Sequence, residues 1–421
     1  SQWSLPHIGW DQVFGTIEPA GSATVAVLDT GVDGAHPDLA GKVEPGTSLI
    51  EAGSDGRSDP NGHGTWMAGI VAAASDNATG IAGIGYAGVK IMPVTVLGAD
   101  GTGSDSNIIA GVTYAADHGA DVILMSFTNS AFSQGLQNAI DYAWSKGAAV
   151  VAAAGNDESA TVNYPAGDRG VIGVANSNEA DELNWTSNFG QDVFMAAPGT
   201  NIYTTAAGGG YATVTGTSAA AAEVAGAAAL MKAASPEASN GVIVDRLAAD
   251  ADPLNGARQA ANGRLDLARS ISDTSINPIE PAGAAPVGEG GPTVGPYSVA
   301  VKKLTITIAG SGSVAFTDTT EPKDNTTCEK TCQISTGNND KGTITASPAS
   351  SSTFSGWSGK SENVTACTET AGGGSCSVAM ENKEQTVTAT FATTAADGSG
   401  SVVGSPGSVV AGSGGNTLTF T

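Results

Sequence analysis

The chain has 421 residues, of which 40% are hydrophobic, so it is long enough for a large folded domain with a sizeable core and a smaller module. It carries 17 Lys and Arg against 41 Asp and Glu, a formal net charge of −24. Such a surface repels phosphate backbones, and we expect no nucleic-acid partner. The most apolar stretch, 218–230, contains Glu223 and is too short to cross a bilayer, so we also expect no membrane span.

Apolar strand-like runs alternate with amphipathic helix-like stretches over residues 24–175. The expected strands are 24–28, 90–96, 121–125, 148–153 and 171–175. The expected helices are 64–74, 104–118, 133–146 and about 218–234, after which Pro236 is expected to open the next helix. Continuous apolar strands separated by helices are typical of a sheet buried on both faces. The pattern therefore predicts an α/β fold, a parallel sheet with helices on both faces.

The last third of the chain has a different pattern. Residues 273–297 carry five prolines among Gly, Ala and Glu, which predicts an extended linker. Period-two alternation at 303–308, 342–346 and 385–391 then predicts a small all-β module. The predicted organisation is a domain at 1–272, a linker at 273–297, the all-β module at 298–392 and a Gly/Ser-rich tail at 393–421. The strand-like segment 416–421 is either a flexible end or the start of a further module.

All four cysteines lie within the predicted all-β module: Cys328, Cys332, Cys367 and Cys376. An even number in a small module indicates disulfides and an oxidising compartment, so we expect a secreted protein. A start at Ser1 without an initiator Met is likewise expected of a processed N-terminus. Binding of zinc is the alternative role for these cysteines, but the second spacing is long and no His lies nearby. On proximity alone we predict the pairs Cys328–Cys332 and Cys367–Cys376, with two other pairings left open.

Three short segments place an Asp, a His and a Ser among small residues. They are Val27-Leu28-Asp29-Thr30-Gly31, Asn61-Gly62-His63-Gly64-Thr65 and Gly216-Thr217-Ser218-Ala219-Ala220. A serine hydroxyl becomes nucleophilic when a histidine takes its proton and a carboxylate orients that imidazole. Each residue alone also has a structural explanation, as a turn residue, a structural histidine or a helix N-cap. Their joint occurrence favours the catalytic interpretation.

At these segments the chain resembles the subtilase family, over about residues 3–269, and the order Asp, His, Ser is that of subtilisin. The resemblance implies a subtilisin-like fold and a secreted serine endopeptidase of broad specificity that forms an acyl-enzyme on Ser218. It also implies extended polypeptides as substrates and, if the precursor carries one, a pro-segment as a partner. The segment Ala153-Ala154-Gly155-Asn156 resembles the one with the family's oxyanion-hole asparagine, which gives Asn156 that role. Its alternative role is that of a turn residue.

Two further stretches resemble the edge strands that flank the substrate backbone in subtilases. They are Gly101-Thr102-Gly103 and Ser126-Phe127-Thr128, and Ala154 and Gly155 complete the expected substrate-binding set. Strand addition gives main-chain affinity with little side-chain selectivity, although a glycine loop and a strand end are the ordinary alternatives. Phe127-Thr128 stands where the family has Leu-Gly, so the preference for the residue before the scissile bond is not carried over.

The segment after the serine also departs from the family. The family's Ser-Met-Ala-x-Pro-His reads here Ser218-Ala219-Ala220-Ala221-Ala222-Glu223. Ala219 removes an oxidisable neighbour of the nucleophile, so we expect tolerance of peroxide. The loss of the proline and the histidine is expected to change the packing of this helix.

A structural Ca²⁺ site is implied by a further resemblance to subtilisins. Its expected ligands are side-chain and main-chain oxygens of Gln2, Asp38, Ser75, Asn77, Thr79 and Ile81. Ca²⁺ takes six to eight oxygen ligands of this kind. The alternative is an N-terminal segment, a turn and an Asn/Gly loop without an ion.

The all-β module resembles β-rich repeat modules of secreted bacterial proteins. Its segment Phe354-Ser355-Gly356-Trp357 offers two aromatic residues for binding a matrix or surface, but core packing is the favoured interpretation. The second functional hypothesis is accordingly a non-enzymatic adhesion protein on a subtilase scaffold. A lipase-type hydrolase is disfavoured because the Gly-x-Ser-x-Gly elbow is missing.

Overall fold

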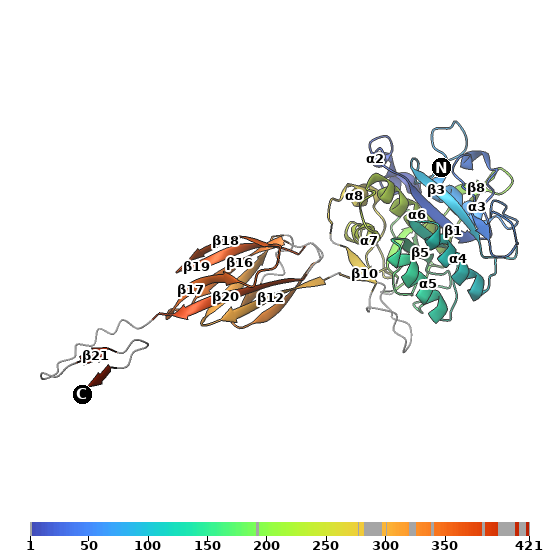
Figure 1. Ribbon diagram of the computed structural model, residues 1–421. Helices are drawn as coiled ribbons and strands as arrows, with labels where there is room; N and C mark the ends of the chain where they lie inside the picture. Colours follow the sequence, from blue (N-terminus) through green and yellow to red (C-terminus); the bar gives the residue numbers. More distant parts are fainter. Residues whose placement is uncertain are drawn as a thin grey trace. The chain divides into compact units, whose positions relative to one another are not determined.

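The computed structural model (Figure 1) describes residues 2–190, 193–276, 278–281, 297–299, 301–319, 326–337, 341–380, 384–394, 409–411 and 418–420. The chain divides into two compact units, Ser1–Ala300 and Val301–Thr421, which we describe separately. Within the described ranges, no helix has both the length and the apolar character needed to cross a membrane.

The first unit is built on a seven-stranded parallel sheet with the order β2-β3-β1-β4-β5-β6-β7. Its strands are β1 (Ala23–Asp29), β2 (Thr47–Ser48), β3 (Val89–Thr95), β4 (Val122–Met125), β5 (Ala149–Ala153), β6 (Val171–Ser177) and β7 (Met195–Pro198). Five of them match the strands expected from the sequence to within two residues at either end. The nearly unbroken apolar runs are explained by burial of the sheet on both faces.

Helices cover both faces of this sheet (Figure 1). On β1, Val25 and Val27 pack in one core cluster with residues of α3 (His63–Ala72) and α6 (Thr217–Ala234). The alternate residues Ala26 and Leu28 pack in a second cluster with α4 (Asp105–Asp117) and α5 (Gln134–Ser145). Since successive side chains of a strand point to opposite faces, the two clusters are the two sides of the sheet. The predicted fold class is confirmed.

The other elements of the first unit are short. They are α1 (Ser4–His7), α2 (Trp10–Val13), the 3₁₀ turn η1 (Pro37–Leu39), β8 (Ile202–Ala206), β9 (Gly210–Val214), α7 (Asn240–Ala249) and α8 (Leu267–Ser272). The helix expected to open at Pro236 instead begins at Asn240. The Ser239 hydroxyl caps it by accepting from the N–H of Val242, while Lys232 Nζ donates to the carbonyls of Pro236 and Ala238 and holds the preceding turn.

Part of the segment predicted to be a linker joins the first unit. Strand β10 (Ile279–Pro281) pairs antiparallel with β11 (Tyr297–Val299). Ile279 is buried and belongs to the same core cluster as α3 and α6. Residues 282–296, the remainder of the proline-rich stretch, lie outside the described residues.

The second unit contains two sheets that share one apolar core (Figure 1). The first sheet holds β15 (Cys332–Gly337), β12 (Val301–Ala309), β20 (Gln385–Thr393) and β17 (Ser352–Ser358). The second holds β14 (Thr326–Cys328), β13 (Gly312–Asp318), β16 (Lys341–Pro348), β19 (Gly373–Ala379) and β18 (Val364–Thr370). The all-β prediction is confirmed, and 418–420 of the strand-like end form β22 (Leu418–Phe420), paired with β21 (Val409–Ala411).

The structure of the second unit answers two questions that the sequence left open: the role of its aromatic residues and the pairing of its cysteines. Phe354 and Trp357 are 5% and 7% exposed and pack with Phe391, so they are core residues. The disulfides are Cys328–Cys332 and Cys367–Cys376, as predicted, which leaves no cysteine for zinc.

Candidate active site

Asp29 ends the strand at which the order of the sheet reverses. Strand β1 lies between β3 and β4, with β2 and β3 on one side of it and β4 to β7 in chain order on the other. In open α/β sheets, ligands bind at such a point, beyond the carboxyl ends of the strands. The Asp29 side chain is fully buried, and its Oδ1 accepts a hydrogen bond of 2.8 Å from the N–H of Thr30.

His63 is the first residue of α3 and faces this carboxylate. Its Nδ1 lies 2.9 Å from each of the two Asp29 oxygens, and its side chain is 24% exposed. The preceding Gly62 has φ of 101°, a left-handed conformation that turns the chain into the helix without steric cost. With Nδ1–H donated to Asp29, Nε2 is the basic nitrogen and is directed away from the carboxylate.

A second carboxylate, Asp59, organises the loop that carries His63. Its Oδ1 accepts from the N–H of Gly62 at 2.7 Å and from Thr30 Oγ1 at 2.8 Å. Its Oδ2 accepts from Thr65 Oγ1 at 2.6 Å. Burial by itself lowers the pKa of His63, but the charge of Asp29, the hydrogen bond to it and the charge of Asp59 raise the pKa above its ordinary value of 6.5. Sequence reasoning missed Asp59, whose only signal is its place four residues before His63.

Ser218 is the second residue of α6 and lies at the end of β4. Its Oγ donates to the carbonyl of Ser126 at 3.0 Å, and Ser126 Oγ donates to the carbonyl of Ser218 at 3.3 Å. Ser126 directly follows β4, in which Met125 is in register with Leu28 of β1. This register brings Ser218 to the same sheet edge as Asp29 and His63, at the positive end of an 18-residue helix.

The amide of Asn156 is oriented by the residue before Ser218. Its Oδ1 accepts from the N–H of Thr217 at 2.9 Å and from Thr217 Oγ1 at 3.2 Å. With the oxygen held in this way, the Nδ2 donor has no hydrogen-bond acceptor among the residues that the structure describes. Thr217 also accepts from the N–H of Gly155 at 3.1 Å. Thr217 was not predicted as a site residue, although it lies inside the Gly-Thr-Ser segment.

The two expected substrate-flanking stretches face one another. Gly101, Thr102, Gly103, Phe127 and Thr128 line one pocket of about 340 Å³. Ser126, at the beginning of the second stretch, contacts Ser218. The carbonyls of Ala154 and Gly155 accept hydrogen bonds from Asn188 at 3.0 and 2.9 Å, and the N–H of Gly155 donates to Thr217, the residue before Ser218.

The expected calcium ligands also gather in one place. Asn77 Nδ2 donates to Asp38 Oδ1 at 2.8 Å, and the N–H of Ile81 donates to Asp38 Oδ2 at 2.7 Å. Gln2 exchanges hydrogen bonds with Ala82, the next residue, at 2.7 and 2.9 Å. Thr79 donates its N–H to Asn77 Oδ1, and Ser75 Oγ is buried without a hydrogen-bond partner among the described residues.

The fit of this cluster to Ca²⁺ can be tested on Asp38. Its side chain is fully buried, and none of its hydrogen-bond donors, which include the Tyr211 hydroxyl at 3.3 Å, is a cation. A buried carboxylate that pairs with no cation among the described residues, and that has oxygen-bearing neighbours, fits a hard cation. Across the described ranges no three His, Cys, Asp or Glu side chains form a metal cluster. The expected calcium site differs from such a cluster, because it has a single acidic ligand and its other ligands are amide, hydroxyl or main-chain oxygens.

Residues 21–266 match the sequence profile of the subtilase family. The chain belongs to the subtilase family. It is therefore a subtilisin-like serine endopeptidase, as the resemblance implied. Residues 303–395 match a second profile, that of the divergent InlB B-repeat domain.

Individual relatives cover the same region. Thermitase from Thermoactinomyces vulgaris is 41% identical over 263 residues, which are 62% of this chain and 91% of thermitase. Subtilisin DY from Bacillus licheniformis is 36% identical over 269 residues, 63% of this chain and 96% of that protein. A thermophilic serine proteinase from Bacillus sp. strain AK1 is 43% identical over 232 residues, 55% of this chain and 57% of that protein.

Proposed function

We propose that this subtilase cleaves peptide bonds through an acyl-enzyme on Ser218, with Asp29, His63 and Ser218 as its catalytic triad. The observation that carries the proposal is the pair of 2.9 Å contacts between His63 Nδ1 and the buried Asp29 carboxylate. This contact selects the tautomer in which Nε2 takes the proton of Ser218 Oγ as the oxygen attacks the carbonyl carbon. The same nitrogen then gives the proton to the leaving amine, while Asp29 stays ionised and stabilises the imidazolium.

The developing oxyanion is stabilised, in this proposal, by Asn156 Nδ2 and the N–H of Ser218. The contact of Thr217 with Asn156 Oδ1 supports this assignment, because it orients the amide before a substrate arrives. Water then attacks the acyl-enzyme with His63 as base, which returns Ser218 to its starting state.

Extended polypeptides are the proposed substrates. They would bind by strand addition to Gly101–Gly103 and Ser126–Thr128, beside Ala154 and Gly155. Main-chain pairing tolerates many side chains, which supports broad specificity. A pro-segment, if the precursor carries one, would occupy the same groove.

We also propose secretion and a division of labour along the chain. Two disulfides in the second unit support an oxidising, extracellular compartment. Residues 1–272 would act as the peptidase domain, 273–297 as a linker, 298–392 as an attachment module for a matrix or surface, and 393–421 as a tail. Since Phe354 and Trp357 are buried, attachment would use other, exposed residues.

A structural Ca²⁺ is the remaining part of the proposal. Oxygens of Gln2, Asp38, Ser75, Asn77, Thr79 and Ile81 would hold it. The ion would supply the counter-charge for Asp38 and tie the N-terminal segment to the loop that follows α3. It takes no part in the chemical step.

The decisive test is labelling with a serine-reactive organophosphonate. Mass spectrometry of the full chain should place the label on Ser218, and Ser218→Ala should abolish both labelling and casein hydrolysis while circular dichroism is retained. Ser145→Ala, at an exposed serine, should behave as the parent. A Ser218→Ala protein that digests casein at the parent rate would overturn the proposal. A folded parent that neither labels nor hydrolyses casein would favour the adhesion hypothesis instead.

A further inference from the structure

The pocket beside the substrate-flanking stretches combines apolar walls with one charge. Its larger lining side chains are Leu97, Ile108, Phe127, Leu136 and Tyr164, and the pocket volume is about 340 Å³. Asp105 is the only charged residue among the described residues that line it. A pocket built in this way suits a ligand that is apolar along its length and cationic at its end.

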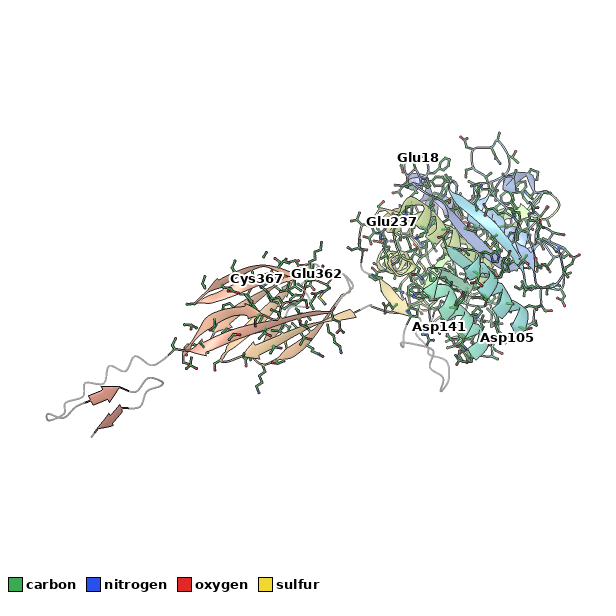
Figure 2. All side chains as sticks on the ribbon, viewed as in Figure 1. Glu18, Asp105, Asp141, Glu237, Glu362 and Cys367 are labelled. Atoms are coloured by element: carbon green, nitrogen blue, oxygen red, sulfur yellow. A yellow bond between two sulfur atoms is a disulfide. The ribbon has the colours of Figure 1, made fainter. Side chains whose placement is uncertain are left out.

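Asp105 is held at this pocket by a contact with a neighbouring helix. It is the first residue of α4, and its Oδ2 accepts a hydrogen bond of 2.6 Å from Ser133 Oγ, the N-cap of α5. This bond joins the starts of two neighbouring helices, on which Figure 2 labels Asp105 and Asp141. Over the part of the chain that the structure describes, no Lys, Arg or His forms an ion pair with Asp105.

A second carboxyl group lies behind the pocket wall. Asp168 is 1% exposed, and its N–H donates to the carbonyl of the lining residue Pro165 at 2.9 Å. Neither of its carboxyl oxygens has a hydrogen-bond partner among the described residues. The pKa of Asp168 is raised to about 7, mainly by burial and also by the charges of Asp141 and Asp105, while the charge of Arg169 opposes the shift. The guanidinium of Arg169, the next residue, is paired with Asp141.

We propose that this pocket binds a Lys or Arg side chain of the polypeptide substrate and that Asp105 is the residue that selects it. The inference rests on the proposed function, since it needs a substrate strand between the two stretches. The aliphatic stem of the cation would pack on Ile108 and Leu136 while its charged end reaches Asp105. An acidic side chain at the same position would be repelled, so the enzyme would favour polypeptides that are basic at this one place.

The position of the pocket limits which substrate residue it can bind. Ser126 contacts Ser218, whereas Phe127 and Thr128 line the pocket. Two residues of extended chain span about 7 Å, and alternate side chains point to opposite faces. The pocket therefore receives one substrate side chain, at a position that is not adjacent to the scissile bond. A basic residue at the substrate positions on either side of that one should not be favoured.

The experiment uses the full chain and four sets of fluorogenic peptides. Each set places Lys, norleucine or Glu at one of the four residues before the scissile bond. We expect kcat/KM for Lys to exceed that for norleucine about fivefold at one position only, the size of a partly exposed ion pair. Glu should be the poorest residue there, and the Lys preference should shrink as salt is added. In Asp105→Asn the ratio of Lys to norleucine should fall to about one.

The matched control is Asp117→Asn, at the other end of the same helix and about 18 Å away. It removes the same charge and should keep the parent's ratio. Equal cleavage of the Lys and norleucine peptides by the parent would overturn the proposal, as would a ratio that survives in Asp105→Asn. Both of these outcomes leave the proposed function intact. If no peptide of any set is cleaved and Ser218 stays unlabelled, the proposed function fails and this proposal fails with it.

Discussion

Ser4, in the first helix of the chain, lies close enough to the carboxyl group of Glu223, five residues after Ser218 on α6, to lower the pKa of that group. Both residues are buried, and Glu223 Oε2 has no hydrogen-bond partner among the described residues. Glu223 stands where the subtilase motif has a histidine. The contact joins the N-terminal segment to the helix that carries the nucleophile, through a group that can gain or lose a proton.

Stability should therefore depend on the protonation of Glu223. Burial raises its pKa from 4.5 to about 8, against the opposing effects of Ser4 and Arg264. The folded chain then keeps a proton that an unfolded chain releases above about pH 4.5. This contribution to the free energy of unfolding is full below pH 4.5, falls as pH rises, and is lost above about pH 8.

The comparison of Glu223→Gln with the parent tests this dependence, with both proteins carrying Ser218→Ala to prevent autolysis. The two melting temperatures should be similar at pH 5, and the Gln variant should melt several degrees higher at pH 9, since about 1 kcal/mol corresponds to about 2–4 °C in a domain of this size. Glu237→Gln, at an exposed position, should follow the parent. Parallel melting curves for Glu223→Gln and the parent across this range would refute the prediction.

The pH at which activity is lost on the acid side should depend on Asp59 as well as on Asp29. The pKa of His63 is raised above 6.5, because the attraction and hydrogen bond of Asp29 and the charge of Asp59 outweigh the opposing effect of burial. Activity needs neutral His63, so kcat/KM should fall as pH drops through that raised value. In Asp59→Asn this fall should move to lower pH. Asp55→Asn removes an exposed charge from the same loop and should shift the pH of this fall less. If the pH of the fall is unchanged in Asp59→Asn, Asp59 does not raise the pKa of His63.

Removal of the amide at position 156 should slow the chemical step selectively. For Asn156→Ala we expect kcat to fall about 10²–10³-fold while KM changes little, because the donor acts on charge that appears only in the transition state. Thr217→Val should give a smaller loss, since it keeps the N–H that binds Asn156 Oδ1 and removes only the hydroxyl. A large rise in KM at unchanged kcat would instead identify Asn156 as a ground-state contact.

Much of the catalytic unit follows from local sequence patterns. Asp29 ends an apolar strand and His63 begins an apolar helix, and both are found there because burial of the sheet on two faces requires those runs. The helix after residue 235 was misplaced, since a proline marks an allowed start whereas the cap is made by Ser239. In the second unit, β17 was missed because Ser and Gly interrupt its alternation, although Phe354 and Trp357 fill the core.

Long-range relationships within the site could not be predicted in this way. Thr217 holds Asn156 from 61 residues away in the chain, and Ser4 lies beside Glu223 although the two are 219 residues apart. The burial of Glu223 was equally hidden, because an acidic residue in an alanine-rich helix normally faces solvent. The sequence also provided no indication of a role for Asp105, because an Asp in the first turn of a helix is common.

Calcium removal should lower the melting temperature of the peptidase unit through Asp38. A ligand present at about 100 times its Kd stabilises the folded state by about 2.7 kcal/mol, and excess chelator should remove this contribution. Asp38→Asn keeps the shape of the side chain but deletes the only charge in the proposed site. It should melt below the parent in calcium and respond little to chelator, whereas Asp76→Asn, in the same loop but outside the ligand set, should respond as the parent does. Calorimetry of Ser218→Ala proteins with parallel metal analysis makes the comparison. A parent that is demonstrably free of calcium yet melts at an unchanged temperature would show that Asp38 is satisfied by its protein hydrogen-bond donors alone.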